Sequence, residues 1–244
     1  PVPRHKNQTM EEITMGFNEK VHAFIAAKFY VYLTEAFGDR GEKAFIHATQ
    51  HYAEQRGRRM AQRAIRDGRE LDYGTYLEYG EWVNTPEIIA EGCQNQSTIE
   101  SFSPDYRIHI TMCPWYTQFK EMGLPDAGHV YCAHLDNSIC RGFNPYLTYL
   151  VPETLHKSGF CTHIIKDVNF KEGEKHPKKL EYTKGFDYHC GHSYWAYSEV
   201  CGAIFGAEGE AIAARVMRDF EETYGKEMAD KLASYRYTNF NIAD

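Results

Sequence analysis

Residues 106–112 read YRIHITM, a run in which apolar and polar side chains alternate. Alternation with a period of two is typical of a β-strand that buries one face. The stretch STIESF at residues 97–102 has a similar pattern, and Ser103-Pro104-Asp105 between the two favours a turn. The sequence therefore predicts an antiparallel β-hairpin in the middle of the chain.

Two more strands are predicted at residues 146–151 and 161–168, joined by a loop. Two short helices fit between the second and third strands, at residues 115–122 and 126–140. The order strand, strand, helix, helix, strand, strand predicts an α+β fold with an antiparallel sheet of about four strands. We expect residues 169–184, which are rich in Lys, Glu and Gly, to form a solvated loop.

The two ends of the chain resemble each other. The segment FGDRGE at residues 37–42 returns as FGAEGE at residues 205–210, a displacement of 168 positions that further matching residues share. We interpret the two ends as helical hairpins that pack on each other or on the sheet, either within one chain or across a homodimer. The predicted helices cover residues 10–37, 40–67, 193–205 and 208–234.

Four glycines of this repeat have an architectural interpretation. Gly38 and Gly206 are placed to end one helix in a left-handed conformation, and Gly57 and Gly225 are expected to interrupt the next. The result is a single domain over residues 1–244. In it, N- and C-terminal helical hairpins flank the sheet, with helical parts at residues 10–90 and 190–235 around an α/β core at residues 95–170.

Composition places the chain among folded globular proteins, since 43% of its 244 residues are apolar and 25% are charged. A net charge of -7 repels phosphate backbones and anionic membranes, so no nucleic acid and no membrane partner is predicted. The basic residues of one predicted helix are interpreted as a solvated face. They are Arg56, Arg58, Arg59, Arg63 and Arg66.

No run approaches the roughly 18 consecutive apolar residues of a membrane span, and no secretory segment is recognisable. Seven cysteines, an odd number without a short secreted framework, favour free thiols in a reducing compartment over disulfides. We therefore expect a cytoplasmic protein.

Residues 113–163 bring together the side chains most suited to chemistry. Cys113 ends a predicted strand, and Pro114 begins the next helix. The positive end of a helix dipole lowers a thiol pKa, which makes Cys113 a candidate nucleophile. Trp115, two residues further on, is a candidate substrate contact. The alternative is a buried strand-end cysteine with Trp115 as a core aromatic residue.

On the helix at residues 126–140, Cys132, Asp136 and Cys140 follow one another at intervals of four and share a face. This face is redox-capable and nucleophilic, with Tyr131 beside it as a candidate substrate contact. The alternative interpretation is that both cysteines are small core residues and that Asp136 pairs locally.

Cys161 and His163 alternate along a predicted strand and so project from the same face. Together with Cys113 and Cys132 they are a conceivable tetrahedral metal site. The absence of a paired C-x-x-C disfavours zinc, so no cofactor is predicted, and a metal ion is kept as the alternative.

Histidine is the natural acid or base near neutral pH, and His163 and His192 are the candidates. Asn144, in the turn Gly142-Phe143-Asn144-Pro145, is expected to present a free amide at a pocket rim. Signatures of nucleotide-binding loops, serine hydrolases and zinc proteases are missing.

Several motifs in order resemble the L-2-amino-thiazoline-4-carboxylic acid hydrolase family over roughly residues 20–235. They are Cys113-Pro114-Trp115, Tyr131-Cys132 with Asp136, Gly142-Phe143-Asn144-Pro145, Thr154-Leu155 to Gly159 with Cys161, and the helix that bears Phe205-Gly206. One departure is Ser158-Gly159, where the family pattern has Gly-Asp. The matching positions are Cys113, Cys132, Asp136 and Cys161.

The resemblance implies a hydrolase that opens a small cyclic amidine by breaking a C–N or C–S bond after water addition, giving an N-carbamoyl amino acid. We expect a cysteine nucleophile and a small-molecule substrate. Two alternatives stay open at this point. One is a metal-assisted hydrolase with Cys and His ligands, and the other is a small-molecule sensor or binding module without catalysis.

Overall fold

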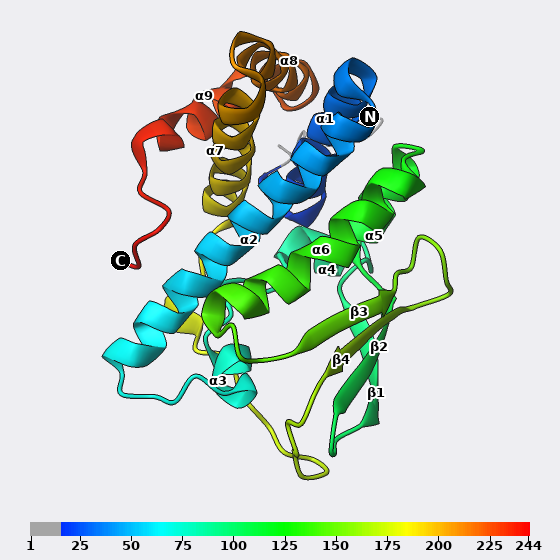
Figure 1. The fold of residues 1–244 in the computed structure, drawn as a ribbon, viewed down its shortest axis with the longest axis vertical. Coiled ribbons are helices and arrows are strands. Elements are labelled where there is room, and N and C mark those ends of the chain that lie inside the picture. The colour runs from blue at the N-terminus through cyan, green and yellow to red at the C-terminus, as the bar shows by residue number, and fades with distance from the viewer. Residues whose placement is uncertain (1–15) are drawn as a thin grey trace, which may run out of the picture.

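The computed structural model describes residues 16–244, which form an α+β fold in which long helices pack beside one small sheet (Figure 1). The helices are α1 (Glu19–Phe37), α2 (Asp39–Arg66), α3 (Tyr73–Glu78), α4 (Pro86–Ala90), α5 (Pro114–Glu121), α6 (Pro125–Phe143), α7 (Phe186–Phe205), α8 (Ala207–Tyr224) and α9 (Lys226–Ser234). The strands are β1 (Gln96–Ser101), β2 (Tyr106–Met112), β3 (Tyr149–Glu153) and β4 (Cys161–Ile165).

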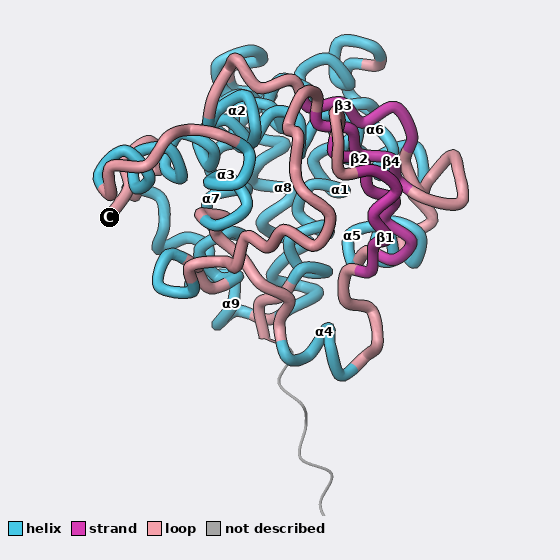
Figure 2. The backbone as a smooth tube through the Cα atoms, turned by 90° about the horizontal axis from the view of Figure 1, so that it is seen from below, coloured by secondary structure: helices cyan, strands magenta, loops and turns pink. Residues whose placement is uncertain are grey.

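The four strands form one antiparallel sheet in the order β1-β2-β4-β3, which confirms the predicted fold class and hairpin. Ile108 pairs with His163 and Ile110 with Cys161, so these four side chains lie on the same face of the sheet. The strands gather at one side of the molecule (Figure 2), and α6 lies between α2 and the sheet. The inner face of the sheet therefore looks toward the helices.

The last two strands are shifted from their predicted bounds. The backbone after α6 makes a turn in which Leu147 N–H donates to the Asn144 carbonyl, and β3 starts only at Tyr149. At the other end, Asp167 and Asn169 have φ angles of 57° and 55°, which are incompatible with an extended strand. β4 therefore ends at Ile165.

The N-terminal helix was predicted to start at residue 10, and residues 10–15 lie outside the described part of the chain. Within the described residues the helix starts at Glu19. The Asn18 side chain accepts hydrogen bonds from the N–H groups of Lys20 and Val21, which caps α1 at Glu19. No helix in the described range 16–244 is long and apolar enough to cross a lipid bilayer.

The two helical hairpins have matching geometry and touch each other within one chain. Gly38 and Gly206, at the turns, have φ angles of 54° and 59°, values that glycine adopts without strain. The rings of Phe37 and Phe205 stack with centroids 3.7 Å apart and planes only 4° apart. The repeat seen in the sequence is therefore a structural repeat, and its copies pack against each other at corresponding positions.

The prediction for Gly57 was wrong, whereas that for Gly225 was correct. Gly225 has a φ of 89° and separates α8 from α9. Gly57 lies inside the unbroken helix α2, where an added Cβ would be 2.0 Å from the Ile139 carbonyl oxygen of α6. Gly142 of α6 faces the Glu54 carbonyl in the same way, at 2.3 Å. These glycines allow the two backbones to cross in close contact.

The basic residues of α2 do not form a solvated face, which corrects the sequence interpretation. Arg59 and Arg63 are fully buried, and their guanidinium groups share the buried carboxylate of Glu81 at 2.7 and 2.6 Å. Arg56 is 6% exposed, and only Arg58 and Arg66 face solvent. The spacing of three and four residues along α2 places cations on its inner face.

Helix α7 starts at Phe186, seven residues before the predicted start. Its first two turns contain His189, Cys190 and His192, all buried among aromatic side chains. The polar composition of this stretch hid its helical character from sequence reasoning, because buried histidines read as loop residues.

The segment at residues 169–184 is docked rather than solvated, which corrects the expectation for it. Lys179 N–H donates to the Glu78 carbonyl at 2.8 Å, and Lys184 N–H donates to the Glu81 carbonyl at 2.7 Å. The Lys178 ammonium donates to the Trp82 carbonyl at 2.6 Å. These contacts hold the segment against α3 and the residues that follow it.

Candidate active site

A cavity of about 240 Å³ lies between the inner face of the sheet and helices α1, α2, α3, α5 and α6. Ile108, Ile110, Cys161 and His163 reach it from the sheet, as their shared face requires. This volume lies just below the range of ~300–1,000 Å³ that is usual for drug-sized ligands. The cavity is suited to a small molecule of a few polar groups.

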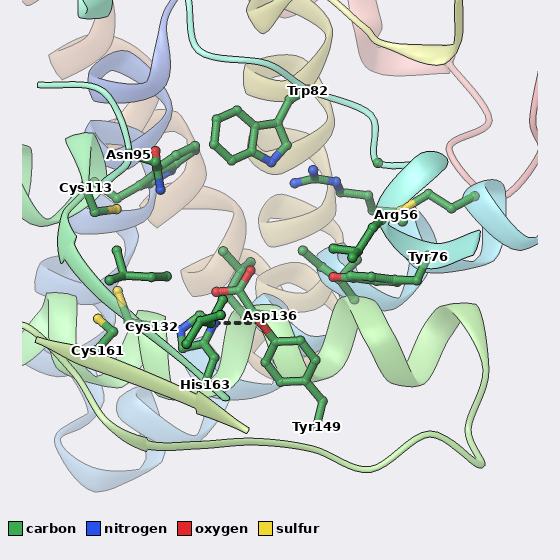
Figure 3. A pocket seen from close by; sticks show the side chains of 18 of the residues that line it. Arg56, Tyr76, Trp82, Asn95, Cys113, Cys132, Asp136, Tyr149, Cys161 and His163 are labelled. Atoms are coloured by element: carbon green, nitrogen blue, oxygen red, sulfur yellow. Dashed lines mark hydrogen bonds between the residues drawn. The ribbon is translucent and has the colours of Figure 1, made fainter. Parts of the chain in front are cut away.

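The cavity gathers most of the residues that the sequence nominated. Cys113, Cys132 and Cys161 place their sulfur atoms on one side of it, and Asp136 and His163 lie on the floor below (Figure 3). Trp115 and Tyr131 also line the wall, as expected of substrate contacts. Cys140, which shares the helix face in sequence, is buried outside the cavity.

Burial keeps the thiols of the cavity protonated at neutral pH. It raises the pKa of Cys113 to about 12 and that of Cys161 to about 11, and the pKa of Cys132 is raised well above its ordinary value. The N–H groups of Tyr116 and Trp115 oppose this shift at Cys113, but burial outweighs them. The predicted low pKa of Cys113 was therefore wrong, and any of these thiols needs a base to become a nucleophile.

One of the three thiols has an imidazole beside it. The Cys132 Sγ atom lies 3.8 Å from Nε2 of His156. His156 packs against Tyr116, with ring centroids 5.1 Å apart and planes tilted by 60°, and covers Gly128, where an added Cβ would be 2.2 Å from the ring. Burial, followed by the charges of His129 and Lys157, lowers the pKa of His156 to about 4. The ring is thus neutral at pH 7, and it is a weaker base than a free imidazole.

Sequence reasoning missed His156 because it lies in the turn between β3 and β4, 24 positions from Cys132. Gly128, one helical turn before Cys132, supplies the space for the ring. A glycine one turn before a cysteine on the same helix was the one available signal, and it is a weak one.

Asp136 sits on the floor of the cavity, one helical turn after Cys132 on α6 (Figure 3). No ion-pair partner for its carboxylate exists among residues 16–244. The neighbouring His163 is bonded through Nδ1 to the Tyr149 hydroxyl at 2.6 Å. Burial lowers the pKa of His163, and the charge of Asp136 opposes this. The carboxylate is available to a cationic ligand.

Arg56 is a charged group that the sequence did not assign to the site. Its side chain extends from α2 into the cavity on the side away from the thiols (Figure 3). Its Nε atom is buried without a hydrogen-bond partner in the described part of the chain. The charges of Glu81 and Asp136 act on Arg56, but Glu81 is bound by Arg59 and Arg63, and neither carboxylate forms an ion pair with Arg56. Arg56 therefore presents a desolvated cation to whatever occupies the cavity.

Two residues nominated by the sequence lie elsewhere. His192 does not line the cavity; its ring bonds to Gln55 Oε1 at 2.8 Å and stacks on Phe240 in the core. The Asn144 amide is not free, since Nδ2 donates to the Leu71 carbonyl and Oδ1 accepts from the Tyr146 N–H. Asn144 ends α6 and positions the chain before β3. The expectation for His192 failed because its ring packs in the core, and that for Asn144 failed because its amide is used at the end of α6.

Residues 16–244 contain no group of three or more His, Cys, Asp or Glu side chains arranged to hold a metal ion. The tetrahedral site considered from the sequence is therefore not formed by its four residues, Cys113, Cys132, Cys161 and His163. They line the same cavity but do not converge on one point.

The molecule is an α+β protein with a cavity of the size of a small molecule. Thiols, a carboxylate and a guanidinium line this cavity. Residues 18–162 match the sequence model of the L-2-amino-thiazoline-4-carboxylic acid hydrolase family, and the chain belongs to that family. The matched range runs from the start of α1 into β4 and includes Arg56, Cys132, Asp136 and His156. No curated protein and no solved structure matches the chain.

Proposed function

We propose that this protein is a hydrolase that opens the ring of a small cyclic amidine by cysteine-dependent addition of water, giving an N-carbamoyl amino acid. Membership of a family named for a hydrolase supports this reaction class. The observation that carries the proposal is the position of Cys132. Its thiol faces the cavity, has an imidazole at 3.8 Å, and lies one helical turn from an unpaired carboxylate.

Asp136 is proposed to bind the amidinium group of the substrate. A carboxylate and an amidinium form two parallel charge-assisted hydrogen bonds, which fix both position and orientation. Because residues four apart on a helix are neighbours, a cation held by Asp136 places its central carbon beside the Cys132 sulfur. The same interaction keeps the amidine protonated, and the carbon of an amidinium is more open to attack than that of a neutral amidine.

The first chemical step is proposed to form a bond between Cys132 Sγ and the amidine carbon. The thiol proton passes to Nε2 of His156 as the bond forms. The bond between this carbon and a ring heteroatom then breaks, and the heteroatom takes up the proton that the thiol released. His163, on the cavity floor, is placed to hydrogen-bond to the departing atom.

The second step is proposed to be hydrolysis of the covalent intermediate. Water adds to the same carbon, the bond to Cys132 breaks, and a proton from the water returns to the sulfur. The net change is the addition of one water molecule to the ring, with no oxidant or cofactor consumed.

A screen of cyclic amidines, lactams and hydantoin-like rings, with mass spectrometry for the gain of one water, tests the reaction class. Cys132→Ala and Cys132→Ser should abolish turnover of any ring that gains water, while Cys140→Ala, on the same helix but outside the cavity, serves as the matched control. Wild-type turnover in both Cys132→Ala and Cys113→Ala would remove covalent catalysis.

A binding module without turnover is the second candidate, and the raised thiol pKa values favour it. It predicts tight binding of a ring and no gain of water in the same screen. Elemental analysis of the purified protein tests the metal-assisted alternative. A small-molecule substrate as the main partner, a homodimer, a cytoplasmic location and the absence of a cofactor stay predictions.

A further inference from the structure

We propose that the side-chain amide of Asn95 is the hydrogen-bond donor that the cavity offers to an oxygen atom on the reacting carbon, and that Glu19 and Asn84 are positioning residues that turn this amide toward the cavity. The inference rests on the proposed function for the step in which that oxygen appears. The donor itself is defined by hydrogen bonds that do not depend on any reaction.

The orientation of these groups starts at a buried carboxylate. Glu19, the first residue of α1, is fully buried. Its Oε1 atom accepts hydrogen bonds from Asn84 Nδ2 at 2.9 Å and from the Thr85 N–H at 3.0 Å. Its Oε2 atom accepts one from the Thr85 hydroxyl at 2.7 Å. A carboxylate can only accept, so the part of the Asn84 amide that faces Glu19 must be its NH₂ group.

Asn84 passes this orientation on to Asn95. The Asn84 Oδ1 atom accepts from the backbone N–H of Asn95 at 3.2 Å. Asn84 Nδ2 gives its second hydrogen to Asn95 Oδ1, also at 3.2 Å. If the Asn95 amide were rotated by 180°, two NH₂ groups would face each other and both would lose a partner. The Oδ1 atom of Asn95 is therefore held toward Asn84, and its Nδ2 atom is turned the other way.

The free side of the Asn95 amide belongs to the cavity. Asn95 lines the cavity from the position just before β1. In Figure 3 its amide nitrogen lies on the side of the sulfur atoms of Cys113 and Cys132, and its oxygen lies on the far side. The Nδ2 atom has no hydrogen-bond partner among residues 16–244. Two N–H donors are therefore available to a ligand.

His22, the other neutral polar side chain that α1 contributes to the cavity wall, has no such capacity. Its Nε2 atom is bonded to the Tyr52 hydroxyl at 3.0 Å, and its Nδ1 atom accepts from Trp115 Nε1 at 3.0 Å. Both ring nitrogens are thus used inside the protein. His22 fixes the wall around the thiols, while Asn95 presents unused donors there.

An oxygen atom reaches the reacting carbon in the second proposed step, when water adds to it. This oxygen becomes the carbonyl oxygen of the product as the bond to Cys132 breaks. Of the two protons of the water, one returns to the sulfur and the other is released, which cancels the positive charge that the amidinium brought. When the N–H groups of the product face Asp136, its oxygen points away from that carboxylate. A fixed N–H donor at Asn95 stabilises the negative charge that develops on this oxygen.

The binding test compares 2-amino-2-thiazoline, which has no oxygen on the carbon, with N-(2-sulfanylethyl)urea, the product of opening that ring. Affinities are measured by NMR titration on Cys132→Ala protein. Asn95→Asp keeps the shape of the side chain and replaces the donor by an acceptor. It should weaken binding of the urea by about 10-fold and should not weaken binding of the cationic ring. Asn169→Asp, at an exposed position outside the cavity, is the control.

The positioning residues are tested with the same two ligands. Glu19→Gln keeps an acceptor for Asn84 Nδ2 and should bind both ligands as the wild type does. Glu19→Leu removes that acceptor and should weaken binding of the urea alone. Should Glu19→Leu fail to fold, Asn84→Leu tests the same contacts.

On protein with Cys132 intact, Asn95→Leu should slow breakdown of the covalent intermediate by about 100-fold. Intact-protein mass spectrometry should then show the mass of the ring added to the protein.

The outcomes separate the donor from the reaction. If Asn95→Asp weakens both ligands equally, or neither, the proposed role of Asn95 is wrong. If no ring gains water but the urea binds in an Asn95-dependent way, the donor stands and the proposed hydrolysis fails. If the ring is hydrolysed and the affinity for the urea does not depend on Asn95, the hydrolysis stands and the donor fails.

Discussion

The Cys132 sulfur and the His156 imidazole face each other across 3.8 Å, from the middle of α6 and from the turn after β3. Each is held by its own surroundings, since α6 carries the thiol and Gly128 and Tyr116 hold the ring. His156 Nδ1 is buried without a partner in the described residues, so no carboxylate raises the basicity of the ring. The pair is therefore neutral at rest, and it must become charged as the substrate reacts.

Replacement of His156 by Asn should lower kcat by about 100-fold or more, because a protonated thiol with a raised pKa is a poor nucleophile without a base. Steady-state kinetics on an identified substrate measure this effect. His129→Asn, on the same wall but bonded to Thr154, is the control for local packing. Equal loss in both variants would assign the effect to structure instead of proton transfer.

Stability should decrease as the pH falls below about 6.5. Burial holds the pKa values of His22, His189 and His192 below that of a free imidazole, with His189 at about 3. The unfolded chain therefore takes up protons near pH 6.5 that the folded chain refuses, and stability present above pH 6.5 is lost on acidification. The loss is on the order of 1.4 kcal/mol per pH unit for each buried histidine.

Urea unfolding at pH 7.5, 6.5 and 5.5 measures this loss. His192→Asn should flatten the dependence relative to wild type, and His47→Asn, at an exposed position of α2, should leave it as it is. A free energy of unfolding that stays constant over the three pH values would show that the buried histidines take up protons without unfolding.

Gly57→Ala should destabilise the protein by more than about 2 kcal/mol, because its Cβ would lie 2.0 Å from a backbone oxygen of α6 and the helices would have to separate. The matched control is Gly202→Ala in α7, where the new Cβ would meet only the Glu210 side chain at 3.6 Å. That change should be neutral or stabilising by up to about 1 kcal/mol. Thermal unfolding compares the two, and similar losses would contradict the proposed crossing.

Much of the fold could be predicted because its signals are local. The alternation in residues 106–112 defined β2, and the turn before it, at residues 103–105, followed from residue composition. The spacing of Cys132 and Asp136 placed them on one face of α6, and the structure brings both to the cavity. Such features depend on neighbours a few positions away, which the sequence displays directly.

The rest of the candidate site depends on tertiary contacts. His156, Arg56 and Lys178 come from a turn, a basic helix and a polar segment, each of which has an ordinary solvated interpretation when taken alone. Their roles arise only when α2, α6 and the sheet enclose a common space. The prediction for His192 was wrong for the opposite reason. A histidine near a helix start was expected to face a ligand, whereas the ring of His192 packs in the core.

The stacking of Phe37 on Phe205 joins the two copies of the helical hairpin, and only the first copy lines the cavity. Every described residue that lines the cavity precedes α7, so the second copy touches no reacting atom. It packs against α1 and α2. Substitutions in α8 and α9 should therefore change how long the molecule stays folded at a given temperature, while each folded molecule keeps its turnover number.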